Sequence, residues 1–523
     1  MGGDVQHHRD SDEFTESSPL LTDQRPRRPS HLPTLSVASI ASVHVPKVHN
    51  GWAIVNLLCI IAFTASASSG LISIPVTRVV EDVVCRQHYG VEESAGVPID
   101  EKQCKDDGIQ SKVAFVMALS GSLDALVGFL AAFPWGLVAD RIGRKPVFVI
   151  ALFGMVLNIF WGMTVLYFHT VFPIELIWLG SAGYAVGGGS AVLIGIILSM
   201  ITDSTTEEER AVAFMRLHVA SLAGNLISPA VSSFMMEKLG PWPPIWSAVV
   251  VIIVAAVTFL FVPETLKHQK YQEDAQELET GVIDSKSRVA HVIARFKESL
   301  SILKSPSLIL LLLTCLGSAP VLYSTLAFMA LFVSKRYDIE LSQAGYIQST
   351  YGIAQVIQAL VFLPWITRYI MKDTTPARFR APDEHHRDLS LARWSFGILL
   401  VGVLILGLSP NLVSFVFGLL LMALGAGFNS LTRSLMTLYI DPEHRSRLFS
   451  LVGMVEVIGS VYAQPFLATL FALGMRLGGG WIGLPYFGVS VLVVVTGSLL
   501  GFVRVPKEAR DSSSTHEDGH YED

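Results

Sequence analysis

The sequence Gly136-Leu-Val-Ala-Asp140-Arg141-Ile-Gly143-Arg144-Lys145-Pro146 is a short charged turn between two long apolar runs. Asp140 is expected to end the first helix, and Gly143 permits a turn that a Cβ would disfavour. Gly136 is expected to let neighbouring helices approach closely. Pro146 suits the first turn of the second helix, because its missing N–H costs nothing there. Basic loops of membrane proteins remain in the cytosol, so we expect this turn on the cytoplasmic face.

The composition indicates a membrane protein. Of the 523 residues, 51% are hydrophobic and only 16% are charged, whereas soluble domains carry about 25% charged residues. The formal net charge of −6 carries little information, because the ionisable residues are concentrated in loops and tails. The chain has no basic patch interleaved with aromatic residues, so nucleic acid is not an expected partner.

About twelve apolar runs follow one another along the chain. Each is long enough to cross a hydrocarbon core of ~30 Å as a helix. Backbone polar groups cannot be left unpaired in lipid, so the predicted fold is an all-α integral membrane protein with both tails on one side. The runs lie at 51–75, 113–138, 147–168, 173–201, 211–236, 244–262, 306–334, 342–367, 391–409, 411–439, 446–473 and 481–503.

Polar segments divide these runs into two halves. Within the first polar segment, Glu16-Ser-Ser-Pro-Leu20-Leu21 has the form of an acidic dileucine sorting signal, which directs proteins to a vacuole-like compartment. The stretch 287–304 is expected to form an amphipathic helix. The expected organisation is a disordered cytosolic tail at 1–50, a six-helix half at 51–265, a cytosolic loop at 266–305, a second six-helix half at 306–505 and a cytosolic tail at 506–523.

The two halves have a related sequence pattern. Gly187-Gly-Gly189 precedes Asp203 by sixteen positions, and Gly425-Ala-Gly427 precedes Asp441 by sixteen. An arginine follows each aspartate, and a phenylalanine, a glycine and a proline follow that arginine at nearly the same offsets. This agreement favours duplication of a six-helix unit, with two pseudo-symmetric halves.

The charged turn closely resembles the G-x-x-x-D-R-x-G-R-[RK] signature of the major facilitator superfamily, and the resemblance covers about residues 51–505. The alternative is an ordinary positively charged cytoplasmic loop. The resemblance implies twelve spans, a central cavity between the halves and a gate at the cytoplasmic rim that stabilises the outward-open state. The gating residues that it implies are Gly136, Asp140, Arg141, Gly143, Arg144, Lys145, Asp203 and Arg210.

The direction of transport stays open at this point, with a slight preference for efflux. Gly224-Asn-Leu-Ile-Ser228-Pro229-Ala-Val-Ser232-Ser233 resembles the G-x-x-x-G-P-x-x-G-G signature of drug–proton antiporters, with serine in place of glycine three times. Serine is small enough to permit close packing. The cysteine-bearing first outer loop, with Arg78, Glu81 and Arg86, instead resembles fungal facilitators related to solute carrier family 46, the proton-coupled folate transporter family.

Two of the four cysteines lie in one long polar loop, at Val76–Lys112. An outward-facing loop lies in an oxidising compartment, so a Cys85–Cys104 disulfide is predicted. It would stabilise the loop by roughly 3 kcal/mol in the chain-entropy model. The alternative is two unpaired thiols. Cys59 and Cys315 fall inside apolar runs and are expected to be packing residues.

Charged side chains inside apolar runs are functional candidates, because each costs ~2.5–3.5 kcal/mol at the centre of a span. Four residues are candidates for proton coupling: Asp124, Glu456, Arg433 and His218. The helical rise places Glu456 about 16 Å and Arg433 about 12 Å from the cytoplasmic end, so the two are expected to pair. The pair serves either as a proton-responsive latch or as a static strut. For Asp124 the alternatives are a carboxylate paired with a neighbouring helix or a residue reached from the outer vestibule. For His218 the alternative is a satisfied core residue.

A polar stripe lies on one helical face of the 342–367 run, where it faces either a cavity or another helix. Substrate hydrogen bonding and interhelical bonding both remain open. The substrate-binding candidates are Gln348, Tyr351, Gln355, Gln358, Tyr323, Asn429 and Arg216.

The favoured function is a proton-coupled secondary transporter of small organic molecules that works by alternating access. The alternatives are a proton-coupled importer or vacuolar exporter of an organic anion or vitamin-like solute, and a non-transporting receptor that keeps the transporter fold. The chain has no Walker A motif and no H-E-x-x-H or G-x-S-x-G sequence, so nucleotide-driven pumping and enzyme activity are not expected. We expect no cofactor or metal, a monomer, and a plasma-membrane or vacuolar location.

Overall fold

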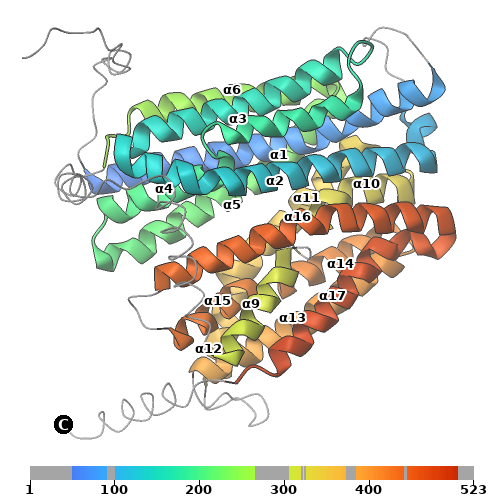
Figure 1. Cartoon of the computed structure of the whole chain (residues 1–523). Helices are drawn as coiled ribbons and strands as arrows, with labels where there is room; N and C mark the ends of the chain where they lie inside the picture. The colour runs from blue at the N-terminus through green and yellow to red at the C-terminus, as the bar shows by residue number, and fades with distance from the viewer. Residues whose placement is uncertain are drawn as a thin grey trace, which may run out of the picture. The chain divides into compact units, whose positions relative to one another are not determined.

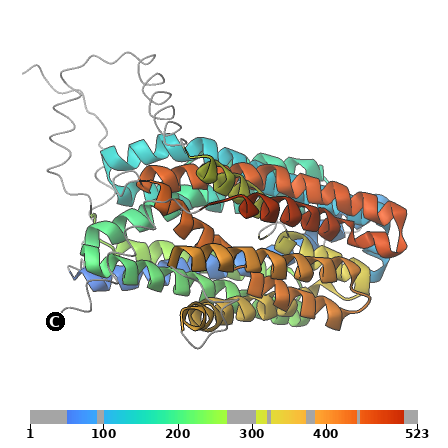
Figure 2. The same ribbon diagram turned by 90° about the horizontal axis from the view of Figure 1, so that it is seen from below.

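The computed structural model of the chain describes residues 50–90, 100–265, 305–319, 322, 325–372, 384–440 and 445–504. In this part of the chain every regular element is a helix, as predicted. Figures 1 and 2 show the long helices running along one another. The predicted tails, the dileucine signal and the 266–304 segment lie outside the described residues.

The first half consists of six spans, and its helices begin where the sequence supplies caps. The Asn50 side chain accepts a hydrogen bond from Trp52 N, and Asp106 accepts one from Gly108 N. Each cap satisfies a backbone donor that the first helical turn leaves free. The elements are α1 (Gly51–Tyr89), η2 (Glu101–Lys105), α2 (Asp107–Ile142), α3 (Arg144–Tyr167), η3 (Ile174–Ala185), α4 (Gly189–Ser204), α5 (Glu207–Leu239) and α6 (Trp242–Leu260).

The second half has more interruptions. Span 8 contains a single π-helical segment, η5, between two α-helical parts. The elements are α9 (Pro306–Ala319), α10 (Thr325–Tyr337), α11 (Leu341–Ile357), η5 (Gln358–Phe362), α12 (Leu363–Ile370), α13 (Glu384–Leu408), α14 (Leu412–Gly425), α15 (Phe428–Met436), η6 (Thr437–Tyr439), α16 (Arg445–Leu477), η8 (Gly479–Gly483) and α17 (Leu484–Gly501).

Eleven segments of the described chain are long and apolar enough to cross a membrane. They coincide with eleven of the predicted runs. The twelfth predicted run, 306–334, is divided between α9 and α10. The all-helical fold is therefore confirmed.

The predicted loop at Val76–Lys112 is wrong in one respect, because much of it is helical. Helix α1 continues to Tyr89, and α2 already begins at Asp107. The extension of α1 carries charges that pair one turn apart, including Arg86 with Asp82 at 2.9 Å. Such pairs stabilise a helix beyond the apolar stretch.

The two glycine triplets of the sequence repeat coincide with helix breaks. Gly187, Gly188 and Gly189 all have positive φ, at 87°, 78° and 61°; the first two lie between η3 and α4, and Gly189 begins α4. A Cβ at Gly187 would lie 2.3 Å from Ala151 Cα, so the break packs directly on α3. In the second half, α14 ends at Gly425 and α15 begins at Phe428. The repeat therefore marks equivalent interruptions of spans 4 and 10.

Two helix pairs join the halves. Helix α2 packs along α16, and α5 packs along α11; the first pair lies side by side in Figure 1. Helices α1 and α5 pack together within the first half. The turn between α2 and α3 lies at one end of these helices, called the motif end, and η2 lies at the other, called the disulfide end.

Candidate transport site

The signature turn is built on Gly143, which has φ 102°. Immediately after it, the backbone N–H groups of Arg144 and Lys145 donate to the Glu264 carboxylate at 3.2 and 2.9 Å. These are free donors at the start of α3, where a negative charge is favourable. Sequence reasoning missed Glu264, which follows α6 in a Pro-Glu-Thr sequence.

The basic residues of the turn bind the ends of two other helices. Arg144 Nη1 forms an ion pair with Asp203 near the end of α4. Lys145 Nζ donates to the carbonyl oxygens of Leu260 and Val262, at 2.6 and 3.0 Å, and so caps α6. The turn thus ties α3, α4 and α6 together at the motif end.

Two other predicted gating residues differ in their exposure. Arg141 is exposed, and Arg210 is half-buried near the start of α5. The side chain of Asp140 lies outside the described part. The expected close packing at Gly136 is wrong, because a Cβ there would have no heavy atom within 4 Å. This glycine lies on an exposed face of α2.

The serine-substituted stretch of α5 packs closely, as its small residues predicted. A Cβ at Gly224 would lie 2.5 Å from Phe63 O of α1. Ser232 is buried and donates to Leu71 O at 2.8 Å. Across the halves, a Cβ at Gly345 of α11 would lie 2.2 Å from Ser233 Oγ. Serine therefore leaves room for the backbone of α5 to approach both α1 and α11.

Arg433 and Glu456 are brought together as predicted. Arg433 Nη2 donates to both carboxylate oxygens, at 2.7 and 2.9 Å, from α15 to α16. Two charge-assisted bonds fix both side chains. Cys315 on α9 lies within electrostatic range of both groups.

Asp124 has a different environment, formed by neutral groups. Asn158 Nδ2 on α3 donates to Asp124 Oδ1 at 3.1 Å, and the side chain of Ser181 on η3 also bonds the carboxylate. The Tyr184 ring lies close enough to interact electrostatically with it. This cluster lies inside the first half, beside the glycine break of span 4.

The polar stripe of α11 is partly buried. Gln355 Nε2 donates to Tyr351 Oη at 2.8 Å, and Tyr351 itself is buried. Gln358 begins η5 and lies against span 10, since a Cβ at Gly427 would be 2.4 Å from Gln358 Nε2. Gln348 is half-buried, and Tyr323 lies outside the described residues.

Asn429 is the second residue of α15, just past the break at Gly427. Its Oδ1 atom is buried, and it has no hydrogen-bond partner within the described part of the chain. A buried acceptor without a partner is costly, so a ligand that donates a hydrogen bond here would recover free energy.

Arg216 lies over the ring of Trp52, 4.5 Å from its centroid. Trp52 Nε1 in turn donates to Glu209 Oε1 at 2.9 Å. This bond and that from Thr206 hold the pKa of Glu209 below its usual range. Arg216 and His218 are both exposed on α5, but about 200° apart around the helix, so they do not share a face. Sequence reasoning missed Trp52.

Residues 110–380 match the family model described as Major Facilitator Superfamily, which is more than half of the chain. The chain is 28% identical over 466 residues to the MFS efflux pump atnC of Emericella nidulans, covering 86% of this chain and 88% of that protein. It is 27% identical over 481 residues to the MFS-type transporter aprT of Aspergillus flavus, covering 89% and 91%.

Among solved structures, the human organic anion transporter MFSD10 (TETRAN) superposes with a TM-score of 0.56. The match covers 86% of this chain and 99% of that chain at 15% identity, so it bears on the fold alone. Fold, signature turn and family match agree. The chain belongs to the Major Facilitator Superfamily and has the fold of a multi-pass membrane transporter.

Proposed function

We propose that this protein exports small organic molecules in exchange for protons, by alternating access of a site between its two halves. The preference for efflux is supported by the partial antiporter signature of α5, which packs between α1 and α11. The similarity to a protein named as an efflux pump supports the same direction.

The observation that carries proton coupling is the two-bond contact between Arg433 and Glu456. Protonation of Glu456 would remove the charge that holds Arg433 and weaken the link between α15 and α16. Asp124 is the second candidate carrier, because its neutral partners permit protonation without stranding a cation. His218 is exposed and ranks below both.

The substrate would bind where the polar face of α11 meets the break in span 10. Tyr351, Gln355 and Gln358 supply phenol and amide groups there, and Asn429 supplies a free acceptor. Together with apolar walls, these groups suit an amphipathic organic molecule. Arg216, at the motif end of α5, offers a positive charge that would favour an organic anion.

A second candidate is a proton-coupled importer or vacuolar exporter of an organic anion. The disulfide between Cys85 and Cys104 favours it, because the first outer loop is where the resemblance to solute carrier family 46 lies. Plasma membrane and vacuolar membrane both remain compatible with this proposal.

The test is ligand-driven proton movement in proteoliposomes, followed with a pH-sensitive dye across a library of organic compounds. We expect a compound to drive proton flux in the wild type and not in Glu456→Gln. Glu175→Gln is the matched control, because this carboxylate is exposed and pairs only loosely with Lys112, at 3.5 Å. It should behave as the wild type.

Retention of flux in Glu456→Gln would make the pair a static strut and move the carrier to Asp124. Saturable uptake with no proton flux for any compound would contradict proton coupling. The direction follows from loading: exchange is supported if the compound accumulates on the more acidic side of the membrane, because protons that run down their gradient then move opposite to the compound.

A further inference from the structure

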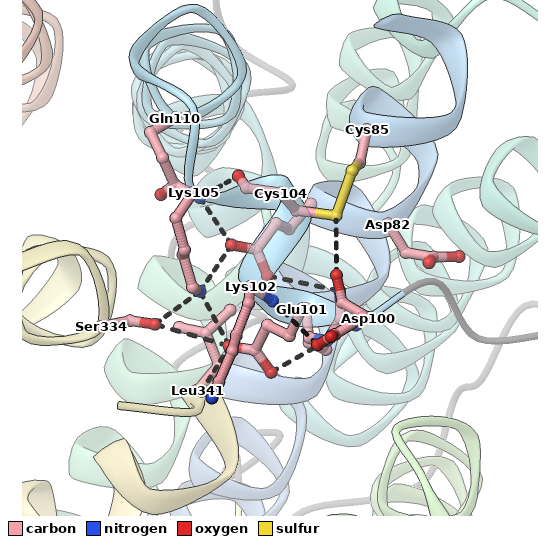
Figure 3. A network of polar contacts seen from close by, with 12 residues as sticks. Asp82, Cys85, Asp100, Glu101, Lys102, Cys104, Lys105, Gln110, Ser334 and Leu341 are labelled. Atoms are coloured by element: carbon pink, nitrogen blue, oxygen red, sulfur yellow. Dashed lines mark hydrogen bonds and ion pairs between the residues drawn. A yellow bond between two sulfur atoms is a disulfide. The ribbon is translucent and has the colours of Figure 1, made fainter. Parts of the chain in front are cut away.

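The disulfide segment, residues 100–107, occupies the disulfide end between the two halves (Figure 3). The bond between Cys85 and Cys104 confirms the predicted pairing and ties η2 to α1, with a Cα–Cα distance of 5.4 Å. Gln110 of α2 binds the same residue of η2, because its Nε2 donates to Cys104 O at 2.9 Å. The segment is therefore fixed on the first half at two points.

Charges within the first half hold the segment further. The side chain of Glu81 is fully buried and accepts hydrogen bonds from Lys105 Nζ at 2.8 Å and Gln110 Nε2 at 2.6 Å. Glu101 pairs with Lys105 at 2.8 Å and with Arg78 at 3.3 Å. Two carboxylates and two cations thus balance one another. This cluster is complete without the second half, so it would survive separation of the halves.

The same charged groups also reach across to the second half. Glu101 Oε1 accepts a hydrogen bond from Leu341 N at 2.8 Å, at the first residue of α11. Lys105 Nζ donates to Ser334 Oγ of α10 at 2.6 Å. A carboxylate at a helix N-terminus and an ammonium on a buried hydroxyl are both charge-assisted contacts.

Lys335 completes the contact from the opposite side. Its ammonium group lies 2.6 Å from Asp107 Oδ1 and also donates to the backbone oxygen of Lys105. One short segment of the first half therefore contacts Ser334 and Lys335 of α10 and Leu341 of α11. Figure 3 shows Ser334 and Leu341 beside this segment.

We propose that the disulfide segment is the gate that closes the disulfide end during alternating access. In this structure the gate is shut. It would open by breaking its contacts with α10 and α11, while the Glu81–Lys105–Glu101–Arg78 cluster moves as one body with the first half. The contacts that break are charge-assisted hydrogen bonds and one ion pair, whose groups water can solvate, so opening is reversible.

The disulfide has a defined part in this gate. Cys104 lies between Glu101 and Lys105 in η2, so the covalent bond to α1 fixes the position of both gating side chains. Without it, the segment would keep only its noncovalent contacts with α1 and α2, and the contacts with α10 and α11 would have to offset part of the entropy cost of ordering η2. Loss of the disulfide should therefore weaken gate closure.

The inference rests on alternating access as proposed above, but its test needs neither substrate nor proton gradient. Spin labels on cysteines introduced at Gln87 of α1 and Val413 of α14, in a Cys59→Ser/Cys315→Ser background, report the distance between the halves at the disulfide end by pulsed electron resonance. Both positions are exposed. The wild type should give one dominant short distance in nanodiscs.

In Glu101→Ala we expect the ratio of the longer-distance population to the shorter to rise about tenfold, the change that loss of one charge-assisted hydrogen bond predicts. Ser334→Ala keeps every charge of the cluster and should shift the populations in the same direction. Cys85→Ser/Cys104→Ser should match Glu101→Ala. Glu175→Ala, which removes an exposed carboxylate of the same end, should leave the distances unchanged.

Wild-type distances in both Glu101→Ala and Ser334→Ala, with monodisperse protein, would overturn the gate. Wild-type distances in Cys85→Ser/Cys104→Ser alone would show that gate closure does not depend on the disulfide. A failure of proton coupling would leave these distances unaffected, so the two proposals fail separately.

Discussion

Arg433 on α15 donates two hydrogen bonds from one nitrogen to the two carboxylate oxygens of Glu456 on α16, at 2.7 and 2.9 Å. The side chains are 41% and 22% exposed, so the pair is only partly withdrawn from its surroundings. Removing Glu456 alone deprives Arg433 of these two bonds, whereas removing both partners leaves neither charge of the pair behind.

The stability of the single variant should therefore differ from that of the double variant. Glu456→Gln should lower the free energy of unfolding by about 1.5–3 kcal/mol, the range for hydrogen bonds to charged groups. The double variant Arg433→Gln/Glu456→Gln should recover at least half of that loss. Thermal unfolding in detergent measures both, and a double variant that is less stable than either single variant would contradict the explanation.

Two glycines of the signature turn should respond in opposite directions to alanine. Gly143 has φ 102°, and a Cβ there would lie 2.7 Å from Glu264 Oε2. Gly143→Ala should therefore cost about 1–3 kcal/mol, because the backbone is strained and the carboxylate must move.

Gly136 lies inside α2, and a Cβ there would meet nothing within 4 Å. Gly136→Ala should stabilise the structure by about 0.5–1 kcal/mol, since alanine loses less backbone entropy in a helix. Thermal unfolding of the two variants side by side is the measurement. Destabilisation by Gly136→Ala would indicate that this glycine packs closely after all.

Glu264 should matter as much as the basic residues of the turn. Its carboxylate accepts from the backbone of Arg144 and Lys145, so Glu264→Ala leaves two donors at the start of α3 without their acceptor. We expect a loss of about 1–3 kcal/mol in stability and a transport rate as low as that of Arg144→Ala.

The neighbouring Thr265→Val variant is the control for this effect. It removes only a long contact from Arg144 Nη1, at 3.4 Å, and should stay close to the wild type. Equal losses in both variants would mean that the end of α6 is merely sensitive to substitution, and that the Glu264 carboxylate has no special part.

Features repeated along the chain could be predicted from the sequence, whereas features that depend on tertiary contact could not. The length and apolar content of the runs predicted the membrane spans. The rise of a helix predicted that Arg433 lies near Glu456, and the two are bonded. Sequence context also gave the Cys85–Cys104 bond. Each of these features follows from spacing along the chain or from the oxidising compartment that an outward-facing loop occupies.

Glu264 was missed because its partners are backbone N–H groups about 120 positions away, which leave no mark in the sequence. The contact of Glu101 with Leu341 was missed for the same reason. Gly136 was misjudged because a glycine in a helix looks the same whether its face is packed or open.

Asn429 should contribute to the affinity for substrate. Its buried Oδ1 atom has no hydrogen-bond partner among the residues described here, and it follows the break at Gly427 that also contacts Gln358. If substrate donates a hydrogen bond to this oxygen, Asn429→Ala should raise KM about tenfold, equivalent to about 1.4 kcal/mol, while kcat changes little. Gln343→Ala, at an exposed position of α11, is the control and should leave KM unchanged. Initial rates of uptake into proteoliposomes over a range of substrate concentrations separate the two constants. An unchanged KM with a lower unfolding temperature would make Asn429 a packing residue, because a purely structural amide affects the fold without affecting the affinity for substrate.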